Sequence, residues 1–227
     1  MLKFFYSGQP NPIKIALFLE EAEIEYEAIP IDVRKGDQHK EDFIALNPNA
    51  KVPVIVDGDS CIFDSNAILI YLADKYQLFL PDKTTANTGS LLSWMMFVAS
   101  GVGPYSGQAV HFQHFAPDKL PYAIKRYRFE ALRHYGILDQ RLGTMQYVLG
   151  DTYTIVDMAV WGWARMIPFI LGEDAFLKLP NLQRLVAEIT VRPAAKRAES
   201  LKDKHRFKTD MDEDAKRNMF PSNYQVE

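Results

Sequence analysis

The stretch Lys-Val-Pro-Val at residues 51–54, followed by Phe-Asp-Ser-Asn-Ala-Ile at residues 63–68, decides the fold of this chain. A Val-Pro step between two short apolar runs indicates a tight peptide, of the kind that can be cis, at the start of a strand. The backbone at such a step has no strand partner and can pair with an extended peptide, as in strand addition. The first stretch therefore predicts a slot for a peptide ligand.

The second stretch opens an apolar helix pattern at Asp64 and Ser65. A serine N-cap and the positive end of the helix dipole favour a carboxylate, and the Asp64 carboxylate favours an ammonium group. A peptide slot, a carboxylate site and an amine site close together in the sequence predict a receptor for glutathione.

Length and composition fit one large domain or two small ones. The chain has 227 residues, of which 48% are hydrophobic, which is enough for a sizeable core. Its formal net charge of −3 gives no electrostatic case for binding nucleic acid or an anionic membrane. The N-terminus lacks the basic region and long apolar run of a signal peptide, so we expect a cytoplasmic protein. The most hydrophobic run, residues 155–171, contains two charged residues and a proline, so we expect no membrane span.

Cysteine and histidine usage argues against disulfide and metal chemistry. The single cysteine, Cys61, excludes an internal disulfide framework, a Cys-x-x-Cys redox pair and a cysteine-rich zinc site. Because it lies on a strand rather than at a helix start, we expect Cys61 to be buried and inert. His111 and His114 have a spacing that a metal site could use, but their one nearby carboxylate, Asp118, follows a proline in a loop. We expect no metal site.

The periodicity of apolar residues gives the two halves of the chain different patterns, α/β in the first and all-α in the second. Expected strands are residues 2–6, 24–31, 53–56 and 61–63, and expected helices of the first half are 13–22, 41–46 and 65–76. Expected helices of the second half are 89–100, 121–142, 154–171, 180–190 and 193–204. Thr154 and Asp157 predict a capping box at the start of a helix.

These patterns predict residues 1–78 as a first domain, 79–87 as a linker, 88–205 as a helical second domain and 206–227 as a polar tail. The linker carries proline and polar residues. The apolar helix over residues 91–98 would be half exposed in a monomer, which favours a dimer.

The chain resembles the glutathione S-transferase family, in particular its bacterial Nu class and the related branch similar to the yeast nitrogen-regulatory prion protein. In the first half the resemblance is carried by Pro-Asn-x-x-Lys at 10–14, Lys-Gly-Asp-Gln at 35–38, Asn-Pro-Asn-Ala-Lys-Val-Pro at 47–53 and Asp-Ser-Asn-Ala-Ile-Leu at 64–69. In the second half it is carried by Gly-Pro at 103–104, His-Phe-x-x-Phe-Ala-Pro at 111–117, Pro-Tyr-Ala-Ile-x-Arg-Tyr at 121–127 and Tyr-Thr-Ile-Val-Asp at 153–157. The resemblance implies a thioredoxin-like N-terminal domain joined to an all-helical C-terminal domain, as a homodimer.

The resemblance also implies which residues meet glutathione, the cosubstrate. They are Gln38, Lys51, Val52, Pro53, Asp64 and Ser65, with Arg126 at a second glutathione. The Val52 backbone would pair with the cysteinyl unit, and Asp64 and Ser65 would bind the γ-glutamyl end. Gln38 and Lys51 would reach the glycine carboxylate. A guanidinium can hold a carboxylate with two hydrogen bonds, which suits Arg126, and the alternative for that residue is a solvated charge on its helix.

The reaction requires glutathione as a thiolate, so a thiol pKa near 8.5 must fall, and donors at a helix N-terminus lower it. Asn11 comes just before the first expected helix, where its amide can donate to sulfur. Ser7 and Gln9 are alternative donors, and the choice among the three stays open. The Nu-like relatives carry Thr or Ala where this chain has Gln9. We expect Tyr6, inside the first strand, to belong to the core.

The sequence therefore predicts an enzyme, a glutathione-dependent transferase or disulfide-bond oxidoreductase without a catalytic cysteine. Its second substrate would be a small electrophile or a disulfide. The alternative is a glutathione-binding regulatory protein with little catalysis, which Gln9 favours.

Overall fold

The computed structural model describes residues 1–224, which form two compact units. The first unit comprises Met1–Ile68 and the chain from Ala194 onward, and the second comprises Leu69–Pro193. The domain boundaries predicted from the sequence stay predictions. Within residues 1–224, no helix has both the length and the hydrophobicity that a membrane span requires.

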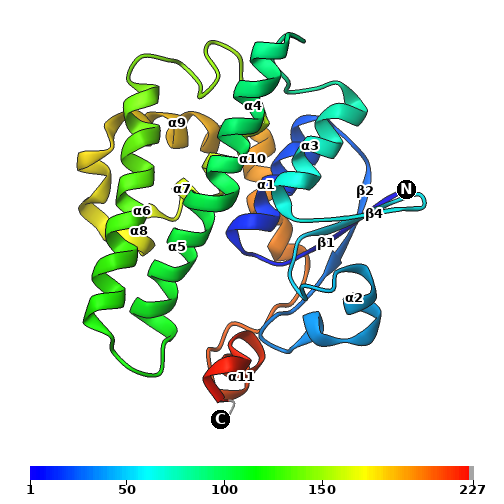
Figure 1. Cartoon of the computed structure of the whole chain (residues 1–227). Coiled ribbons are helices and arrows are strands. Elements are labelled where there is room, and N and C mark those ends of the chain that lie inside the picture. The colour runs from blue at the N-terminus through cyan, green and yellow to red at the C-terminus, as the bar shows by residue number, and fades with distance from the viewer. Residues whose placement is uncertain (225–227) are drawn as a thin grey trace. The chain divides into compact units, whose positions relative to one another are not determined.

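The first unit is built on a four-stranded mixed sheet (Figure 1). Its strands are β1 (Leu2–Tyr6), β2 (Tyr26–Pro30), β3 (Val54–Asp57) and β4 (Ser60–Phe63). Their order in the sheet is β2-β1-β3-β4, with β1 parallel to β2 and antiparallel to β3. Strands β3 and β4 form an antiparallel hairpin, as the Asp-Gly-Asp turn at residues 57–59 predicts. All four strands lie within two residues of their expected bounds.

Helices of the first unit follow the apolar pattern of the sequence, with the exception of α11 (Glu213–Met219). They are α1 (Pro10–Glu21), α2 (Glu41–Leu46), the start of α3 (Ser65–Tyr76), α10 (Pro193–Ser200) and α11 (Glu213–Met219), with a 3-10 turn at Asp37–His39. Helix α1 begins with prolines in its first turn, where a missing N–H costs nothing. The α11 helix lies in the segment predicted as a polar tail, and Asp212 caps it through the backbone N–H of Ala215 at 2.9 Å.

The second unit is helical, as predicted. Its helices are α4 (Thr85–Phe97), α5 (Gly103–Val110), α6 (Pro121–Leu142), α7 (Ile155–Ala164), α8 (Ile167–Leu171) and α9 (Pro180–Thr190). The prediction of one helix over residues 154–171 is wrong, because Pro168 lacks an N–H and its ring clashes with the carbonyl of residue 164. Helix α5 lies outside the helices that the sequence predicts, and Pro104 stands in its first turn, where a missing N–H costs nothing. The capping box at Thr154 and Asp157 is confirmed.

Candidate functional site

The start of α3 is capped by an acidic residue, Asp64. Asp64 holds a φ of +69°, a left-handed conformation that a non-glycine residue keeps only where its surroundings fix it. Its Oδ1 accepts hydrogen bonds from the backbone N–H groups of Asn66 at 2.9 Å and Ala67 at 3.2 Å, so Asp64 caps the helix. Ser65 follows and is only 4% exposed. The exposed Asp64 carboxylate thus stands at the N-terminus of α3, and the prediction of Ser65 as the N-cap is wrong, because the Asp64 side chain caps the helix.

Behind this helix start lies Lys14 of α1, a lysine that is 1% exposed. Its Nζ donates a hydrogen bond to the Ser65 Oγ at 3.3 Å. Burial lowers the pKa of Lys14 to about 7, and the field of the Asp64 carboxylate opposes that shift. A positive group beneath a helix N-terminus adds to the attraction for an anion at that terminus.

The Val52-Pro53 peptide is cis, and Val52 lies outside both strand ladders. The pairings of β3 with β1 and with β4 both begin at Val54, so no strand within residues 1–224 pairs with Val52. Val52 is held in place because it packs in an apolar cluster with Ile31, Phe43 and Val54. Its backbone is therefore fixed and can bind an extended ligand.

The three candidate thiol donors lie in the turn after β1 and in the first turn of α1. Gln9 is the residue before α1, in an extended conformation, and Asn11 lies in the first turn of the helix rather than before it. Ser7 is 5% exposed, and its Oγ has no hydrogen-bond partner among the described residues. Ser7 and Gln9, with Gly8 between them, line a cavity of about 660 Å³. A buried hydroxyl without a partner beside a cavity is available to a ligand.

Tyr6 is a core residue, as expected. Its hydroxyl donates to the carbonyl oxygen of Leu201 at 2.9 Å and lies 2.7 Å from the Nδ1 of His205. Burial raises the pKa of Tyr6 to about 12. A hydroxyl that is so weakly acidic and already bonded is a poor donor for a thiolate.

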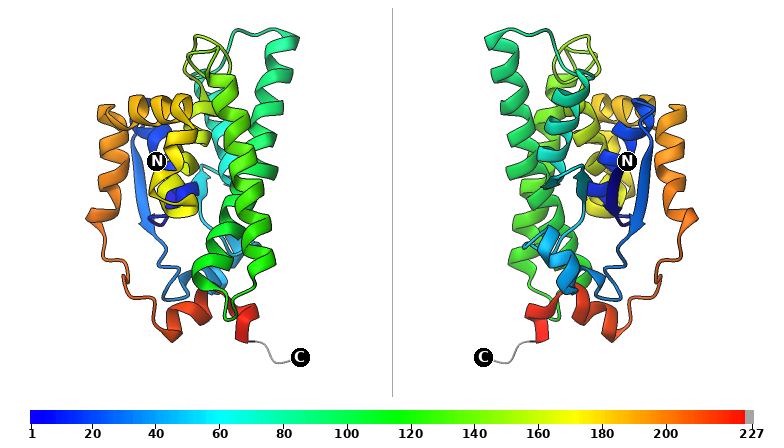
Figure 2. Two further views of the ribbon diagram at one scale, coloured as in Figure 1. Left: turned by 90° about the vertical axis from the view of Figure 1, so that its left-hand side faces the viewer. Right: turned by 90° about the vertical axis from the view of Figure 1, so that its right-hand side faces the viewer.

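The segment after α10 folds back onto the turn that follows β2, and Figure 2 shows it running to α11. Arg34 donates to the Lys208 carbonyl oxygen at 2.7 Å, and the Asn218 side chain donates to the Arg34 carbonyl oxygen at 2.9 Å. Gly36 has a φ of +83°, and a Cβ there would lie 2.9 Å from the Asn218 Oδ1, so both conformation and space require glycine.

This segment also engages Gln38, one of the predicted glutathione contacts. The buried Gln38 amide nitrogen donates to the carbonyl oxygens of Val33 at 3.2 Å and Asn218 at 2.9 Å. Its Oε1 has no partner among the described residues. A ligand carboxylate at Gln38 would therefore compete with Asn218 for the same amide protons. The other predicted contact to the glycine end, Lys51, is exposed.

Comparison with known families identifies the chain. The family model described as "Glutathione S-transferase, N-terminal domain" matches residues 2–74, and "Glutathione S-transferase, C-terminal domain" matches residues 114–197. Disulfide-bond oxidoreductase YfcG of Escherichia coli K12 is 41% identical over 170 residues, which cover 72% of this chain and 79% of that protein. The chain belongs to the glutathione S-transferase family.

Two further relatives define its place among the transferases. A crystal structure of a glutathione transferase family member from Pseudomonas fluorescens, with two glutathione bound, matches with a TM-score of 0.81 and 34% identity, covering 87% of this chain and 92% of that one. Protein URE2 of Meyerozyma guilliermondii is 27% identical over 235 residues, covering 86% of this chain and 78% of that protein. The predicted fold, family and resemblance to the regulatory branch are thus confirmed.

Arg126 of the transferase belongs to the second unit. It lies on α6 and forms an ion pair with Glu130 at 2.8 Å, and Arg133 bonds the same carboxylate at 2.9 Å. These contacts, with burial opposing them, hold the pKa of Glu130 below its usual value, the hydrogen bond from Arg133 being the largest cause. The role of Arg126 at a second glutathione stays a prediction.

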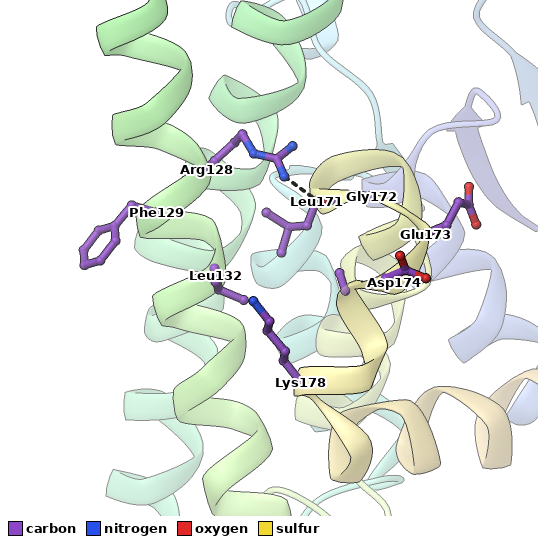
Figure 3. Close-up of a pocket in the computed structure, with 9 residues that line it drawn as sticks. Arg128, Phe129, Leu132, Leu171, Gly172, Glu173, Asp174 and Lys178 are labelled. Atoms are coloured by element: carbon purple, nitrogen blue, oxygen red, sulfur yellow. Dashed lines mark hydrogen bonds between the residues drawn. The ribbon is translucent and has the colours of Figure 1, made fainter.

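A separate cavity of about 360 Å³ lies on the second unit (Figure 3). Arg128 reaches into it from α6 and donates to the Leu171 carbonyl oxygen at 2.6 Å, which caps the end of α8. Glu173, Asp174 and Lys178 give the cavity mixed charge. Because Arg128 is engaged in this structural cap, the cavity offers no concentrated charge to a ligand.

The transferase site contains no cysteine, and the expectation of a buried Cys61 is wrong. Cys61 is exposed on β4, and its Sγ donates to the carbonyl oxygen of Leu46 at 3.3 Å. Strand β4 is an edge strand of the sheet, so the Cys61 side chain has little to cover it. Partial burial still raises the pKa of Cys61, which keeps the thiol protonated. Within residues 1–224, no cluster of three or more His, Cys, Asp or Glu residues could hold a metal.

Proposed function

We propose that this protein binds glutathione along Val52 and uses its thiolate to reduce disulfides or to attack small electrophiles. The observation that carries the proposal is the fixed Val52 backbone, outside both strand ladders, in the same unit as the Asp64-Ser65 start of α3. An extended peptide on Val52 gains backbone hydrogen bonds. Its γ-glutamyl amine and carboxylate are matched by Asp64 and by the helix terminus.

In the disulfide reaction, the thiolate of one glutathione attacks one sulfur of the substrate disulfide and releases the other sulfur as a thiolate. A second glutathione then attacks the mixed disulfide. The products are glutathione disulfide and two substrate thiols, so two glutathiones supply both electrons. The Pseudomonas fluorescens relative with two glutathione bound supports this stoichiometry. Arg126 is proposed to bind a carboxylate of the second glutathione.

The thiolate requires a hydrogen-bond donor, and the candidates are Ser7, Gln9 and Asn11. Ser7 is supported by its buried hydroxyl without a described partner, and Asn11 by its place in the first turn of α1. We expect the alanine variant of the true donor to lose about 100-fold in kcat/KM, a typical cost of removing one donor to a developing anion. The thiol pKa of bound glutathione should rise in the same variant.

The test is turnover of hydroxyethyl disulfide with glutathione and a coupled reductase, beside conjugation of chlorodinitrobenzene. Bound thiolate is followed by its ultraviolet absorbance across pH. The control is Tyr6→Phe, which removes a hydroxyl of similar location that is bonded to Leu201. That variant should keep its kcat/KM. Unchanged kinetics in all three alanine variants would refute the thiolate mechanism.

A regulatory binding protein with little catalysis is the second candidate. Gln9 at the thiol turn and the similarity to Protein URE2 favour it. Tight glutathione binding without a fall in thiol pKa, and without turnover in either assay, would support this candidate over the enzyme.

We also propose a cytoplasmic homodimer. A glutathione-dependent reduction requires a pool of reduced glutathione, which the cytosol maintains. Leu92 and Met96 are exposed apolar side chains on α4, and a second copy of the chain would cover them. Sedimentation should give a dimer, and Leu92→Glu with Met96→Glu should give a monomer. A monomeric wild-type protein would refute the assembly.

A further inference from the structure

Lys14 is a buried lysine that forms no ion pair within the described part of the chain. It is 1% exposed in α1, where Ile15 beside it is fully buried and Ile13 is half-buried. Among the described residues its ammonium makes one hydrogen bond, to Ser65, and no ion pair within 4.0 Å. Burying a charge without a partner is expensive, so a lysine at this position calls for a compensating anion.

The single hydrogen bond fixes the direction of the Ser65 hydroxyl. An ammonium group has donors only, so the Ser65 Oγ must accept the bond from Lys14 at 3.3 Å. The Ser65 proton must then point to another acceptor, and no described residue supplies one. Because it donates to the Ser65 oxygen, Lys14 leaves the Ser65 hydroxyl proton available to a ligand.

Three features of positive character converge at this point. They are the Lys14 ammonium, the Ser65 hydroxyl proton and the N-terminus of α3, a helix of 12 residues. The nearest negative group, the Asp64 carboxylate, is exposed and occupied in capping α3. An incoming carboxylate would meet all three and would neutralise Lys14.

We propose that Lys14 is a positioning residue for the γ-glutamyl carboxylate, which it recognises through the Ser65 hydroxyl and through its own charge. The inference rests on the proposed glutathione site and deepens it. It names the part of the ligand that the buried ammonium selects, an α-carboxylate next to a free amine.

Binding should then be coupled to protonation. Burial lowers the pKa of Lys14 to about 7 in the free protein, and a bound carboxylate raises it. The full affinity is present below pH 7 and falls by up to tenfold per pH unit above it. Among the described residues, Asp64 is the charged group whose field acts on Lys14, and that field raises the pKa of Lys14 against the effect of burial.

The experiment uses the full-length protein and two ligands. The first is S-methylglutathione, whose blocked sulfur removes the thiol titration. The second is its 4-aminobutyryl analogue, which keeps the amine and lacks the α-carboxylate. Calorimetric titration at pH 6.5 and pH 8.0 compares the wild type with Lys14→Met, which matches the length of the lysine stem and carries no charge.

Lys14→Met should weaken S-methylglutathione at pH 6.5 by about tenfold or more, as expected for a hydrogen bond to a charged group. It should leave the analogue unchanged within about twofold, and it should abolish the pH dependence. Equal losses for both ligands, or no loss for either, would overturn the role of Lys14.

A second variant tests the same proposal in case Lys14→Met fails to fold. Ser65→Ala keeps Lys14 and removes the hydroxyl between it and the ligand. It should also weaken S-methylglutathione selectively over the analogue. If Ser65→Ala keeps the full preference for S-methylglutathione over the analogue, the proposed role of the Ser65 hydroxyl between Lys14 and the carboxylate is refuted. A wild-type protein that binds neither ligand would instead refute the proposed glutathione site itself.

Discussion

Replacing Lys14 by methionine should stabilise the ligand-free protein, and by an amount that depends on pH. Burial lowers the pKa of Lys14 from 10.5 to about 7 in the folded state. At about 1.4 kcal/mol per pKa unit, this shift corresponds to on the order of 5 kcal/mol of destabilisation when the lysine is protonated in both states. Loss of the hydrogen bond to Ser65 reduces the stability gained by the variant by about 1 kcal/mol. Lys14→Met should therefore gain about 4 kcal/mol at pH 6.

The sign of the pH dependence follows from the lowered pKa. Below pH 7 both the folded and the unfolded wild type hold the proton, so the penalty is complete. Between pH 7 and 10.5 the folded state releases the proton before the unfolded state does, so wild-type stability rises relative to the variant. The advantage of Lys14→Met should shrink by about 3 kcal/mol between pH 6 and pH 9.

Urea unfolding, followed by circular dichroism at pH 6, 7, 8 and 9 and at one fixed protein concentration, measures both proteins. Subtracting the two unfolding free energies cancels every other titrating group. A difference that stays constant with pH would refute the reasoning, because it would mean that Lys14 does not change its charge over this range.

Two further predictions concern the capping box and the C-terminal segment. Thr154→Ala removes the side chain that accepts from the backbone at the start of α7 and bonds to Asp157, and it should cost about 1–2 kcal/mol in urea unfolding; a loss below a few tenths would contradict the cap. Asn218→Ala removes the hydrogen bond to the Arg34 carbonyl, so hydrogen exchange should become faster at residues 32–39. The matched control is Lys216→Ala, a partly exposed residue of α11. Unchanged exchange at those residues would mean that Asn218 does not hold the segment in place.

The elements that the sequence predicts well are those whose residues decide their own conformation. Strand bounds follow the alternation of apolar residues, and the helix at Pro121–Leu142 begins and ends where expected. Two of the errors involve prolines. Pro168 divides a run that is apolar apart from Asp157 and Arg165, and helix α5, with Pro104 in its first turn, lies outside the predicted helices.

The candidate site is predictable where it depends on local backbone and not where distant segments meet. The Val52-Pro53 slot and the cap at Asp64 are each made by neighbours in sequence. The contact between Gln38 and Asn218 joins residues 180 positions apart, and a polar segment gives no periodic signal that would reveal its docking site. Partners at such separation are fixed by the packed fold, so only coordinates reveal them.

The burial of Lys14 is not apparent from the type of residue alone. Its motif contributes to the family resemblance, yet a lysine in a helix is usually expected to extend its ammonium to solvent. The signal against that expectation is the apolar character of its flanks, Ile13, Ile15 and Ala16, together with a position one turn below the prolines that open α1. Asn11, three residues before Lys14, is the polar residue of that turn, but the Lys14 side chain is 1% exposed, so its ammonium finds a partner inside the protein. The structure supplies one hydrogen-bond acceptor, the Ser65 oxygen, and in our proposal a ligand carboxylate balances the charge. The same charge that destabilises the empty protein therefore adds to the affinity for a carboxylate, and removing it should alter stability and binding in opposite directions.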